Sequence, residues 1–345
     1  MIFMRRRFLA LLLTVILPML CTALPAYATP SYKIMLILYR GTTEAEKGFM
    51  EYFKKRQIPV EFIIRDAQAD NNRIAEFVRE AKAIKPDLIY TFGTTATTEV
   101  VGIQGEVDAN RHITNIPVVF NIVADPVGAK LVKNMKSSGR NLTGASHLVP
   151  LATQMNALQS LRSISQLGVI YNPQEKNSQL AVQELEALAP QLKLTLQRAP
   201  VPPAASGKPD SDTLEQALKT LIASKPQFIY IPSDSFMIKN ARMVVQTAHA
   251  AGIPVFAATE APVRTDGALA GLVSTYYNVG EFAAYKAEQI LVKKVAAKDI
   301  PIEVLHRFTF LVNMSSAKKL KVYPPAQVLK IAELISPVEA TDARE

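Results

Sequence analysis

The sequence contains no tryptophan and only one cysteine, Cys21, among its 345 residues. A lone cysteine cannot form an intramolecular disulfide, and Cys21 lies in a segment that we expect to be removed. The mature chain would therefore hold no thiolate nucleophile and no cysteine metal ligand. Long polar tracts are also missing, and 49% of the residues are hydrophobic, so the chain can bury a full core. Its length suggests about two domains.

Recognisable catalytic groups are missing too. The sequence has no Gly-x-Ser-x-Gly elbow, no dinucleotide-binding Gly-x-Gly-x-x-Gly motif and no phosphate-loop spacing. None of the four histidines has the spacing of a metal ligand pair or stands beside a candidate nucleophile; they are His112, His147, His249 and His306. We therefore predict a binding protein rather than an enzyme, without cofactor or metal. Carboxylate pairs of the glycosidase type remain an alternative that sequence does not exclude.

Charge argues against a nucleic-acid partner. Three of the 39 basic residues are Arg5, Arg6 and Arg7, and without them 36 basic residues face 30 acidic ones, a formal charge of +6. The lysines and arginines are scattered along the chain instead of concentrated on one element, as nucleic-acid binders require. The pattern indicates a mildly basic, solvated surface.

The N-terminus has the three parts of a signal peptide. The basic residues 5–7 precede an apolar run, Phe8–Leu20, and then the small-x-small pattern Ala26–Ala28. The run is short for a membrane span, so we predict cleavage after Ala28 and export to the periplasm. Two alternatives are an uncleaved anchor and lipid attachment at Cys21, although a bulky Leu20 precedes that cysteine.

Strand-like and helix-like segments alternate along the mature chain. Predicted strands are Ile34–Tyr39, Val60–Ile64, Leu88–Phe92 and Pro117–Val123, and predicted helices between them are Ala45–Lys55 and Asn71–Ala83. This alternation indicates an α/β fold in which parallel strands are joined by right-handed crossovers, a doubly wound sheet.

The second half of the chain repeats the first. Three segments recur in the same order at offsets of 140, 137 and 132 residues: Lys85–Tyr90 at Lys225–Tyr230, Ile116–Phe120 at Ile253–Phe256, and Leu36–Tyr39 at Gly168–Tyr171. The Pro-, Ser- and Ala-rich segment Ala199–Asp212 is predicted to be a surface loop inserted into the second copy. Two similar doubly wound lobes follow from this repeat.

Ligands of open parallel sheets bind at the carboxyl ends of the strands, so the candidate site residues are those that follow each strand. Gly93-Thr94-Thr95 follows the third strand and opens a helix. The N–H groups and the dipole of that helix favour an anion. Alternatively, Thr94 or Thr95 caps the helix, and the two roles are compatible.

The remaining candidates are polar or acidic. Asp125, after the fourth strand, either binds a ligand ammonium or fixes its turn. The corresponding turns of the second half supply Tyr171, Asn177, Ser178, Asp234, Ser235 and Glu260. An anion site on one lobe and carboxylates on the other suit a zwitterion such as an amino acid.

Several short motifs together resemble a known family. They are Lys85-Pro86-Asp87 with Gly93–Ala96, Ile116–Phe120 with Asp125-Pro126-Val127, Gly139–Gly144, Tyr171-Asn172-Pro173 with Asn177-Ser178, Gly252–Phe256, Gly267–Ala270 and Tyr277–Gly280. From Lys33 to Pro324 the chain resembles the substrate-binding proteins of ABC transporters, in particular the TrpX-like group of tryptophan/tyrosine type. Where that group often has proline, this chain has Thr95 and Ser138, so the group's ligand does not transfer directly.

The resemblance implies a type I periplasmic-binding fold with three crossings between the lobes, near residues 144–148, 274–276 and 303–306. Lobe 1 would then hold residues 29–145 and 276–303, lobe 2 would hold 146–275 and 304–335, and 336–345 would form a flexible tail. A helix at 280–292 would return to lobe 1, and a strand at 308–312 to lobe 2. The implied function is capture of a small molecule by hinge closure and delivery to an ABC permease in the inner membrane by a monomer. A sensor that signals to a membrane partner is the alternative.

Overall fold

The computed structural model describes residues 31–305 and 307–336. The predicted signal peptide, residues 1–28, and the predicted tail, apart from Ser336, lie outside these residues. Within them, no helix is long and apolar enough to cross a membrane. The strands are β1 (Tyr32–Leu38), β2 (Val60–Asp66), β3 (Leu88–Phe92), β4 (Val118–Val123), β5 (Leu142–Ser146), β6 (Gln166–Tyr171), β7 (Thr195–Pro200), β8 (Phe228–Ile231), β9 (Val255–Ala257), β10 (Ala270–Val273), β11 (Glu303–Val304), β12 (Thr309–Asn313) and β13 (Glu333–Ile335).

Helices connect these strands. They are α1 (Glu44–Lys55), α2 (Asn71–Ile84), α3 (Gly93–Val101), α4 (Leu151–Leu161), α5 (Lys176–Leu188), α6 (Ser211–Ala223), α7 (Ser235–Lys239), α8 (Ala241–Ala250), α9 (Glu260–Arg264), α10 (Tyr276–Leu291), the short 3-10 helix η1 (Ala297–Asp299), α11 (Met314–Leu320) and α12 (Ala326–Leu329). Capping residues fix where several of them begin. Thr43 and Glu46, for example, form a reciprocal capping box at α1.

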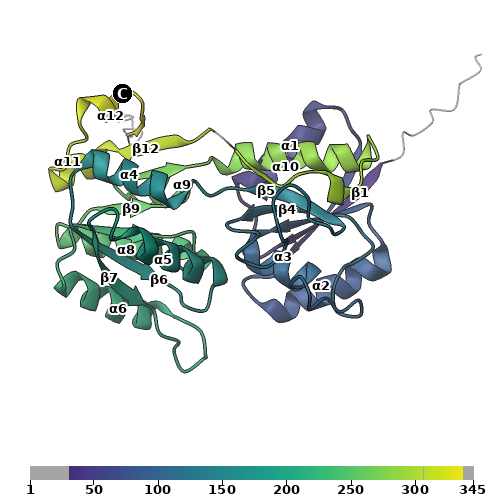
Figure 1. Cartoon of the computed structure of the whole chain (residues 1–345), viewed down its shortest axis with the longest axis horizontal. Coiled ribbons are helices and arrows are strands. Elements are labelled where there is room, and N and C mark those ends of the chain that lie inside the picture. The colour runs from purple at the N-terminus through teal and green to yellow at the C-terminus, as the bar shows by residue number, and fades with distance from the viewer. Residues whose placement is uncertain (1–30, 306, 337–345) are drawn as a thin grey trace, which may run out of the picture. The chain divides into compact units, whose positions relative to one another are not determined.

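Two sheets organise the described residues, and helices cover both faces of each (Figure 1). The first has the order β11-β5-β4-β3-β1-β2 and the second β13-β12-β10-β9-β8-β6-β7. This confirms the predicted α/β fold with two doubly wound lobes. Every strand pair is parallel except β10 with β12, so the expectation of parallel strands fails at that one pair. We call the parts built on these sheets lobe 1 and lobe 2.

The boundaries of the elements agree closely with the sequence pattern. The third predicted strand coincides with β3, and the others differ from β1, β2 and β4 by one or two residues at their ends. The predicted loop Ala199–Asp212 is wrong at both ends. β7 continues to Pro200 and α6 begins at Ser211, because Asp210 caps that helix through the Thr213 N–H.

The internal repeat has a counterpart in backbone conformation. Lys85 and Lys225 occupy matching positions, each just before the proline that precedes a central strand, and both have φ of 53°. Each follows a helix of its own lobe, α2 and α6. The left-handed residue ends the helix and turns the chain into the next strand, so the repeated sequence encodes the same local turn twice.

Helix α10 lies against α1 of lobe 1 and is longer than the predicted helix 280–292, beginning at Tyr276. Tyr52 donates a hydrogen bond to Glu288, and Lys55 pairs with Glu281 at 2.8 Å. Gly280 permits this close approach, because a Cβ atom there would collide with the Ala45 carbonyl. The exact residues at which the chain divides into lobes remain a prediction.

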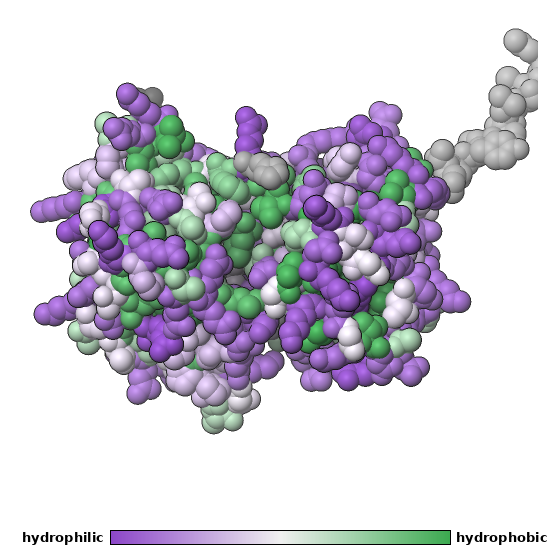
Figure 2. Space-filling model, viewed as in Figure 1, coloured by the Kyte–Doolittle hydropathy of each residue, from purple (hydrophilic) through white to green (hydrophobic). Residues whose placement is uncertain are grey.

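Hydrophilic residues are spread over the face of the molecule seen in Figure 2, with hydrophobic residues among them. A surface of this kind agrees with the scattered lysines and arginines of the sequence. The core beneath consists of apolar clusters on the two faces of each sheet. That packing holds the strand ends, and therefore the site residues, in place.

Candidate functional site

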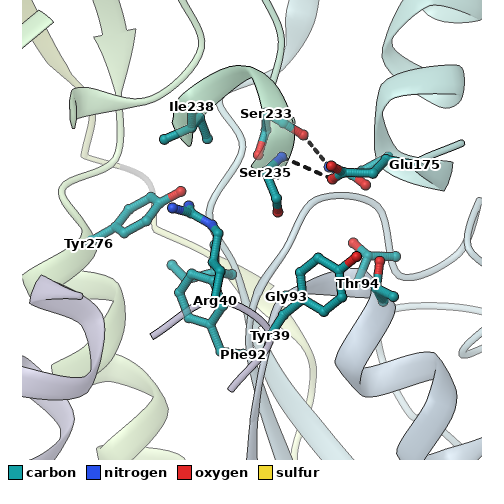
Figure 3. A pocket seen from close by; sticks show the side chains of 13 residues that line it. Tyr39, Arg40, Phe92, Gly93, Thr94, Glu175, Ser233, Ser235, Ile238 and Tyr276 are labelled. Atoms are coloured by element: carbon teal, nitrogen blue, oxygen red, sulfur yellow. Dashed lines mark hydrogen bonds between the residues drawn. The ribbon is translucent and has the colours of Figure 1, made fainter. Parts of the chain in front are cut away.

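A small pocket lies where the carboxyl ends of strands from both lobes meet (Figure 3). Lobe 1 contributes residues at or just after the ends of β1, β3 and β4, and lobe 2 residues after β6 and β8. The lining residues are Tyr39, Arg40, Phe92, Gly93, Thr94, Thr95, Ile122, Glu175, Asn177, Ser233, Ser235, Ile238 and Tyr276. We call this the interlobe pocket. The strand-end rule led to the predicted candidates, and four of them lie here: Thr94, Thr95, Asn177 and Ser235.

Thr94 and Thr95 open α3 as expected, but neither caps it. No side chain accepts a hydrogen bond from the first turn of α3, so the capping alternative is wrong for this helix. Thr97 and Thr98 donate instead to carbonyls one turn back, Gly93 and Thr94. The start of α3 therefore faces the pocket without a capping side chain, as an anion-binding helix terminus requires.

Arg40 supplies the positive charge of the interlobe pocket. It follows β1, and its guanidinium lies 5.4 Å from the centre of the Phe92 ring. Its Nε atom is buried and has no hydrogen-bond partner among the described residues. A buried guanidinium donor without a partner is costly, so this group is suited to an anionic ligand.

Glu175 supplies the negative charge from lobe 2. Its side chain is only 6% exposed, and its carboxylate accepts the N–H groups of Ser235 and Phe236 at 2.9 and 3.0 Å. These bonds hold the carboxylate at the start of α7, where Figure 3 shows it facing Thr94 across the pocket. One cation and one carboxylate thus line the same small space from different lobes.

Asp234, a predicted ligand contact, is turned away from the interlobe pocket. It is fully buried and accepts hydrogen bonds from Asn172 N, Ser178 Oγ and Met237 N at 2.6, 2.6 and 2.9 Å. Burial, and then the neighbouring Glu175, raise the pKa of Asp234 to about 8. Asp234 and Ser178 therefore stabilise the turn after β8. The Ser178 hydroxyl donates to the Asp234 carboxylate, so neither group is free to bind a ligand.

Asp125 and Glu260 also lie outside the interlobe pocket. Asp125 accepts from Val127 N and Gly128 N at 3.1 and 2.8 Å, which is the turn-fixing alternative. It lines a neighbouring cavity of about 260 Å³, which shares Asn177 and Ser233 with the interlobe pocket. Glu260 accepts from Tyr276 N and from Arg264 Nε at 2.7 and 3.1 Å. Tyr171 ends β6 and packs against the lobe 2 core. The structure therefore does not bring these three candidates to the pocket.

Aromatic and apolar side chains form much of the lining, and sequence reasoning missed them. Tyr39, Phe92 and Tyr276 surround Arg40 in Figure 3. Burial raises the pKa of Tyr39 and of Tyr276 to about 12, so both hydroxyls stay protonated at neutral pH and can donate. Tyr39 is the last residue of a predicted strand and Arg40 follows it directly, so the strand-end rule itself could have found them.

Ile122 marks a strained point in the lining. This β-branched residue has φ of 55°, and the pairing of β4 with β5 slips at the same place. The Asn121 carboxamide oxygen accepts the Ile122 N–H at 3.0 Å and stabilises the bulge. Positive φ costs a β-branched residue energy, and such strain is concentrated at functional sites.

His147 lies beside the pocket, in the chain between β5 and α4. Its ring is 2% exposed, and Nε2 is 3.0 Å from Ser233 Oγ. The ring also meets the Tyr276 ring edge-on, with centroids 5.7 Å apart. Burial, and then the positive charge of Arg40, lower the pKa of His147 to about 3, so the folded protein keeps this imidazole neutral.

A neutral, buried His147 should make the protein less stable in acid. The unfolded chain takes up this proton near pH 6.5 while the folded one does so only near pH 3. Stability from this group is therefore complete above pH 6.5 and is lost as the pH falls towards 3. We expect urea unfolding of the wild type, relative to His147→Phe, to lose roughly 2 kcal/mol between pH 7.5 and 5.0. Parallel curves for the two proteins would show that folding does not lower the pKa of His147.

The free space at the centre of the interlobe pocket is about 20 Å³. That volume holds about one water molecule. An amino acid is much larger than this space.

Comparison with known proteins shows which family this chain matches. Residues 34–335 match the family model described as ABC transporter substrate binding protein. The tyrosine-binding protein of Clostridioides difficile (strain R20291) is 26% identical over 83% of this chain and 79% of its own length.

Solved structures agree in fold. A conserved domain protein from Vibrio cholerae has a TM-score of 0.78 at 24% identity and covers 89% of this chain and 100% of its own. An ABC domain from Streptococcus pneumonia, crystallised in complex with L-Trp, has a TM-score of 0.77 at 23% identity with the same coverage.

Proposed function

Because the chain belongs to the family of ABC transporter substrate-binding proteins, we propose that it captures an amino acid, or a similar small zwitterion, between its lobes and delivers it to an ABC importer. The observation that carries the proposal is that one basic and one acidic side chain, Arg40 and Glu175, both line one small pocket. A free amino acid holds a carboxylate and an ammonium two bonds apart on either side of its α-carbon. A pocket with one group of each sign is complementary to both.

Each charge has supporting groups of its own lobe. The α-carboxylate would bind Arg40 and the start of α3, where Thr94 and Thr95 stand. The ammonium would bind the Glu175 carboxylate, which two backbone N–H groups hold in place. Charge-assisted bonds of this kind are the strong ones in a buried site, and they require the ligand to contact both lobes at once.

The lining also indicates the nature of the ligand side chain. Tyr39, Phe92, Ile238 and Tyr276 present apolar or aromatic surface, and aromatic rings pair favourably with one another. The relatives named above as tyrosine-binding and L-Trp-bound support the same choice. We therefore propose an aromatic amino acid as the first ligand to test, with Asn177 and Ser235 as further polar contacts.

Binding is proposed to proceed by hinge closure. The ligand would dock on one lobe while the lobes are apart, and its contacts with the second lobe would favour the closed state. Only contacts that differ between the states can drive this change, and the Arg40–Glu175 pair provides them. Catalysis has no part in this proposal, because the lining is explained by recognition of a zwitterion.

The predicted signal peptide suggests where the protein would act. Removal of residues 1–28 would release the mature chain into the periplasm, where it would meet an ABC permease in the inner membrane as a monomer. N-terminal sequencing of the exported protein that begins at Thr29 would support this. A retained Met1 or a lipidated Cys21 would contradict it.

Ligand analogues test the proposal directly. Calorimetric titration of the mature chain with L-tyrosine should show tight one-to-one binding. Two analogues that each lack one charge, tyramine and 3-(4-hydroxyphenyl)propionate, should each bind at least about 30-fold more weakly, since each leaves one buried charge unpaired. Saturating L-tyrosine should also raise the melting temperature by mass action.

The controls separate ligand identity from ligand class. A thermal-shift screen of the other amino acids covers the case in which L-tyrosine is the wrong side chain. Equal affinity for L-tyrosine and both analogues, or no stabilisation by any amino acid, would overturn the zwitterion proposal.

A further inference from the structure

The Tyr276 hydroxyl is a buried polar group of the interlobe pocket. The residue lines the pocket and is 6% exposed, and its hydroxyl has no hydrogen-bond partner among the described residues. Tyr90, which is also buried, donates to Glu46 at 2.6 Å. A buried tyrosine hydroxyl normally has such a partner, because leaving it unpaired is costly. The missing partner of Tyr276 therefore points to a ligand group.

Packing, rather than a hydrogen bond of the hydroxyl, fixes the Tyr276 ring. Tyr276 is the first residue of α10, and its backbone N–H donates to the Glu260 carboxylate at 2.7 Å. The rings of Phe92 and His147 meet the Tyr276 ring edge-on, with centroids 6.2 and 5.7 Å away. These contacts hold the ring by themselves, so a ligand that binds the hydroxyl does not have to order this side chain.

Arg40 lies at the same part of the pocket. It contacts the Phe92 ring that Tyr276 also meets, with its guanidinium 5.4 Å from the ring centre. Figure 3 shows the Arg40 guanidinium beside the Tyr276 hydroxyl. The Nε donor of Arg40 is buried and, like that hydroxyl, has no partner in the part of the chain that the structure describes. Two unsatisfied polar groups therefore face the same region of the pocket.

The chemistry of the two groups determines what can bind both of them. A guanidinium has N–H donors and no acceptor, so a ligand atom that binds Arg40 must accept. A tyrosine hydroxyl can donate, and no group within the described residues takes the hydrogen of Tyr276. A ligand group that reaches both side chains can therefore accept a hydrogen bond from each. A carboxylate suits this place, because it has two oxygens and only accepts.

We propose that the Tyr276 hydroxyl is a second side-chain donor to the ligand carboxylate, beside Arg40, and that the two together restrict the pocket to ligands with a free carboxylate. This assignment rests on the proposed function and narrows its ligand class. Hydrogen bonds to a charged acceptor are about twice as strong as those between neutral groups. An amidated amino acid keeps the ammonium and the side chain but gains much less from both donors.

Tyr276→Phe tests the role of the hydroxyl, because phenylalanine keeps the ring contacts. Calorimetric titration should show that L-tyrosine binds about 10- to 30-fold more weakly, since a hydrogen bond to a charged group is lost. Tyramine has no carboxylate, so its affinity should change less than twofold. Tyr285→Phe is the matched control and should leave both affinities unchanged, because Tyr285 lies on the same helix, stacks on Phe282 and is 45% exposed.

L-Tyrosinamide tests the ligand class. At a pH at which both ammonium groups are charged, the wild type should bind it at least about 30-fold more weakly than L-tyrosine. In Tyr276→Phe this preference should fall about fivefold or more, because only L-tyrosine loses a charge-assisted hydrogen bond. An unchanged preference would overturn the assignment of the carboxylate to Tyr276.

Thermal unfolding without added ligand gives a second readout. Tyr276→Phe removes a buried hydroxyl that has no partner, so it should melt at the wild-type temperature or above it. Tyr90→Phe takes a donor from the buried Glu46 and should melt about 2–4 °C lower. An equal decrease in both variants would show that the Tyr276 hydroxyl has a structural partner, and the assignment would be wrong.

The same titrations separate the two ways of failing. If the wild type binds no amino acid, the proposed function fails and the role of Tyr276 fails with it. If the wild type binds L-tyrosine but Tyr276→Phe binds it equally well, or loses tyramine to the same extent, the proposed function stands and only the role of the Tyr276 hydroxyl is refuted.

Discussion

Replacing Arg40 with glutamine should weaken L-tyrosine binding about 100-fold while the fold survives. The side chain lies at the pocket rather than in the core, with its guanidinium on the Phe92 face. Glutamine keeps a hydrogen-bond donor but removes the charge, so the ligand carboxylate would be buried without a cation. Truncating one partner of a buried charge pair typically costs about 2–5 kcal/mol, and about 2.7 kcal/mol corresponds to a factor of 100.

A ligand without a carboxylate distinguishes this loss from a general defect. Tyramine binding should change less than threefold in Arg40→Gln, because tyramine offers nothing for the guanidinium to bind. Calorimetry with both ligands measures the difference. Equal losses for L-tyrosine and tyramine would show that Arg40 shapes the pocket without binding the carboxylate.

Arg73 provides a matched control for this experiment. Its guanidinium also lies over a phenylalanine, Phe77, at 5.8 Å, and it bonds Gln68 on the surface of lobe 1. It does not line the interlobe pocket. Arg73→Gln should leave both affinities unchanged, which would separate the position of the charge from the mere loss of one arginine.

The fold could be predicted from sequence because its signals are local. Apolar runs such as Leu88–Phe92 and turn residues such as Pro86 and Pro226 determine strand limits within a residue or two. The repeat works in the same way, since Lys85 and Lys225 impose one turn at equivalent places. The antiparallel pair of β10 and β12 has no such signal, because it depends on where a distant strand docks.

The sequence predicts which turns form the site, but not which side chains of those turns line the pocket. The rule that ligands bind after parallel strands led to the segments that hold Thr94, Thr95, Asn177 and Ser235, which line the interlobe pocket. It could not decide which acidic residue of lobe 2 lines the pocket. Asp234 is drawn inwards by three hydrogen-bond donors. Glu175 reaches the pocket instead, because the Ser235 and Phe236 N–H groups bind its carboxylate there.

Backbone geometry accounts for another part of what the sequence could not predict. Ile122 enters the lining through a bulge and a positive φ that β-branched residues rarely adopt. No propensity rule would place isoleucine in that conformation. The sequence likewise does not distinguish His147 from the other three histidines. Only the structure shows that its ring is buried between Ser233 and Tyr276.

Replacing Glu175 with glutamine should weaken L-tyrosine binding by about 30- to 100-fold, the second large effect that we expect. The ligand ammonium would lose its carboxylate in a buried place, again a cost of about 2–3 kcal/mol. Binding of 3-(4-hydroxyphenyl)propionate should change little or improve, because that ligand has no ammonium and is repelled by a carboxylate. The variant thus inverts the selectivity of the pocket for a positive group.

The fold should tolerate this change at a small cost. In Glu175→Gln the carboxamide oxygen can still accept one N–H at the start of α7, and losing a charge at a helix N-terminus costs about 0.3–1 kcal/mol. Glu184→Gln is the matched control, because Glu184 lies on the helix that follows Glu175 and lines the neighbouring cavity but not the interlobe pocket. We expect calorimetry to show wild-type affinity for Glu184→Gln. If Glu175→Gln and Glu184→Gln bind L-tyrosine equally well, the ammonium is held elsewhere and the Arg40–Glu175 pair is not the recognition element.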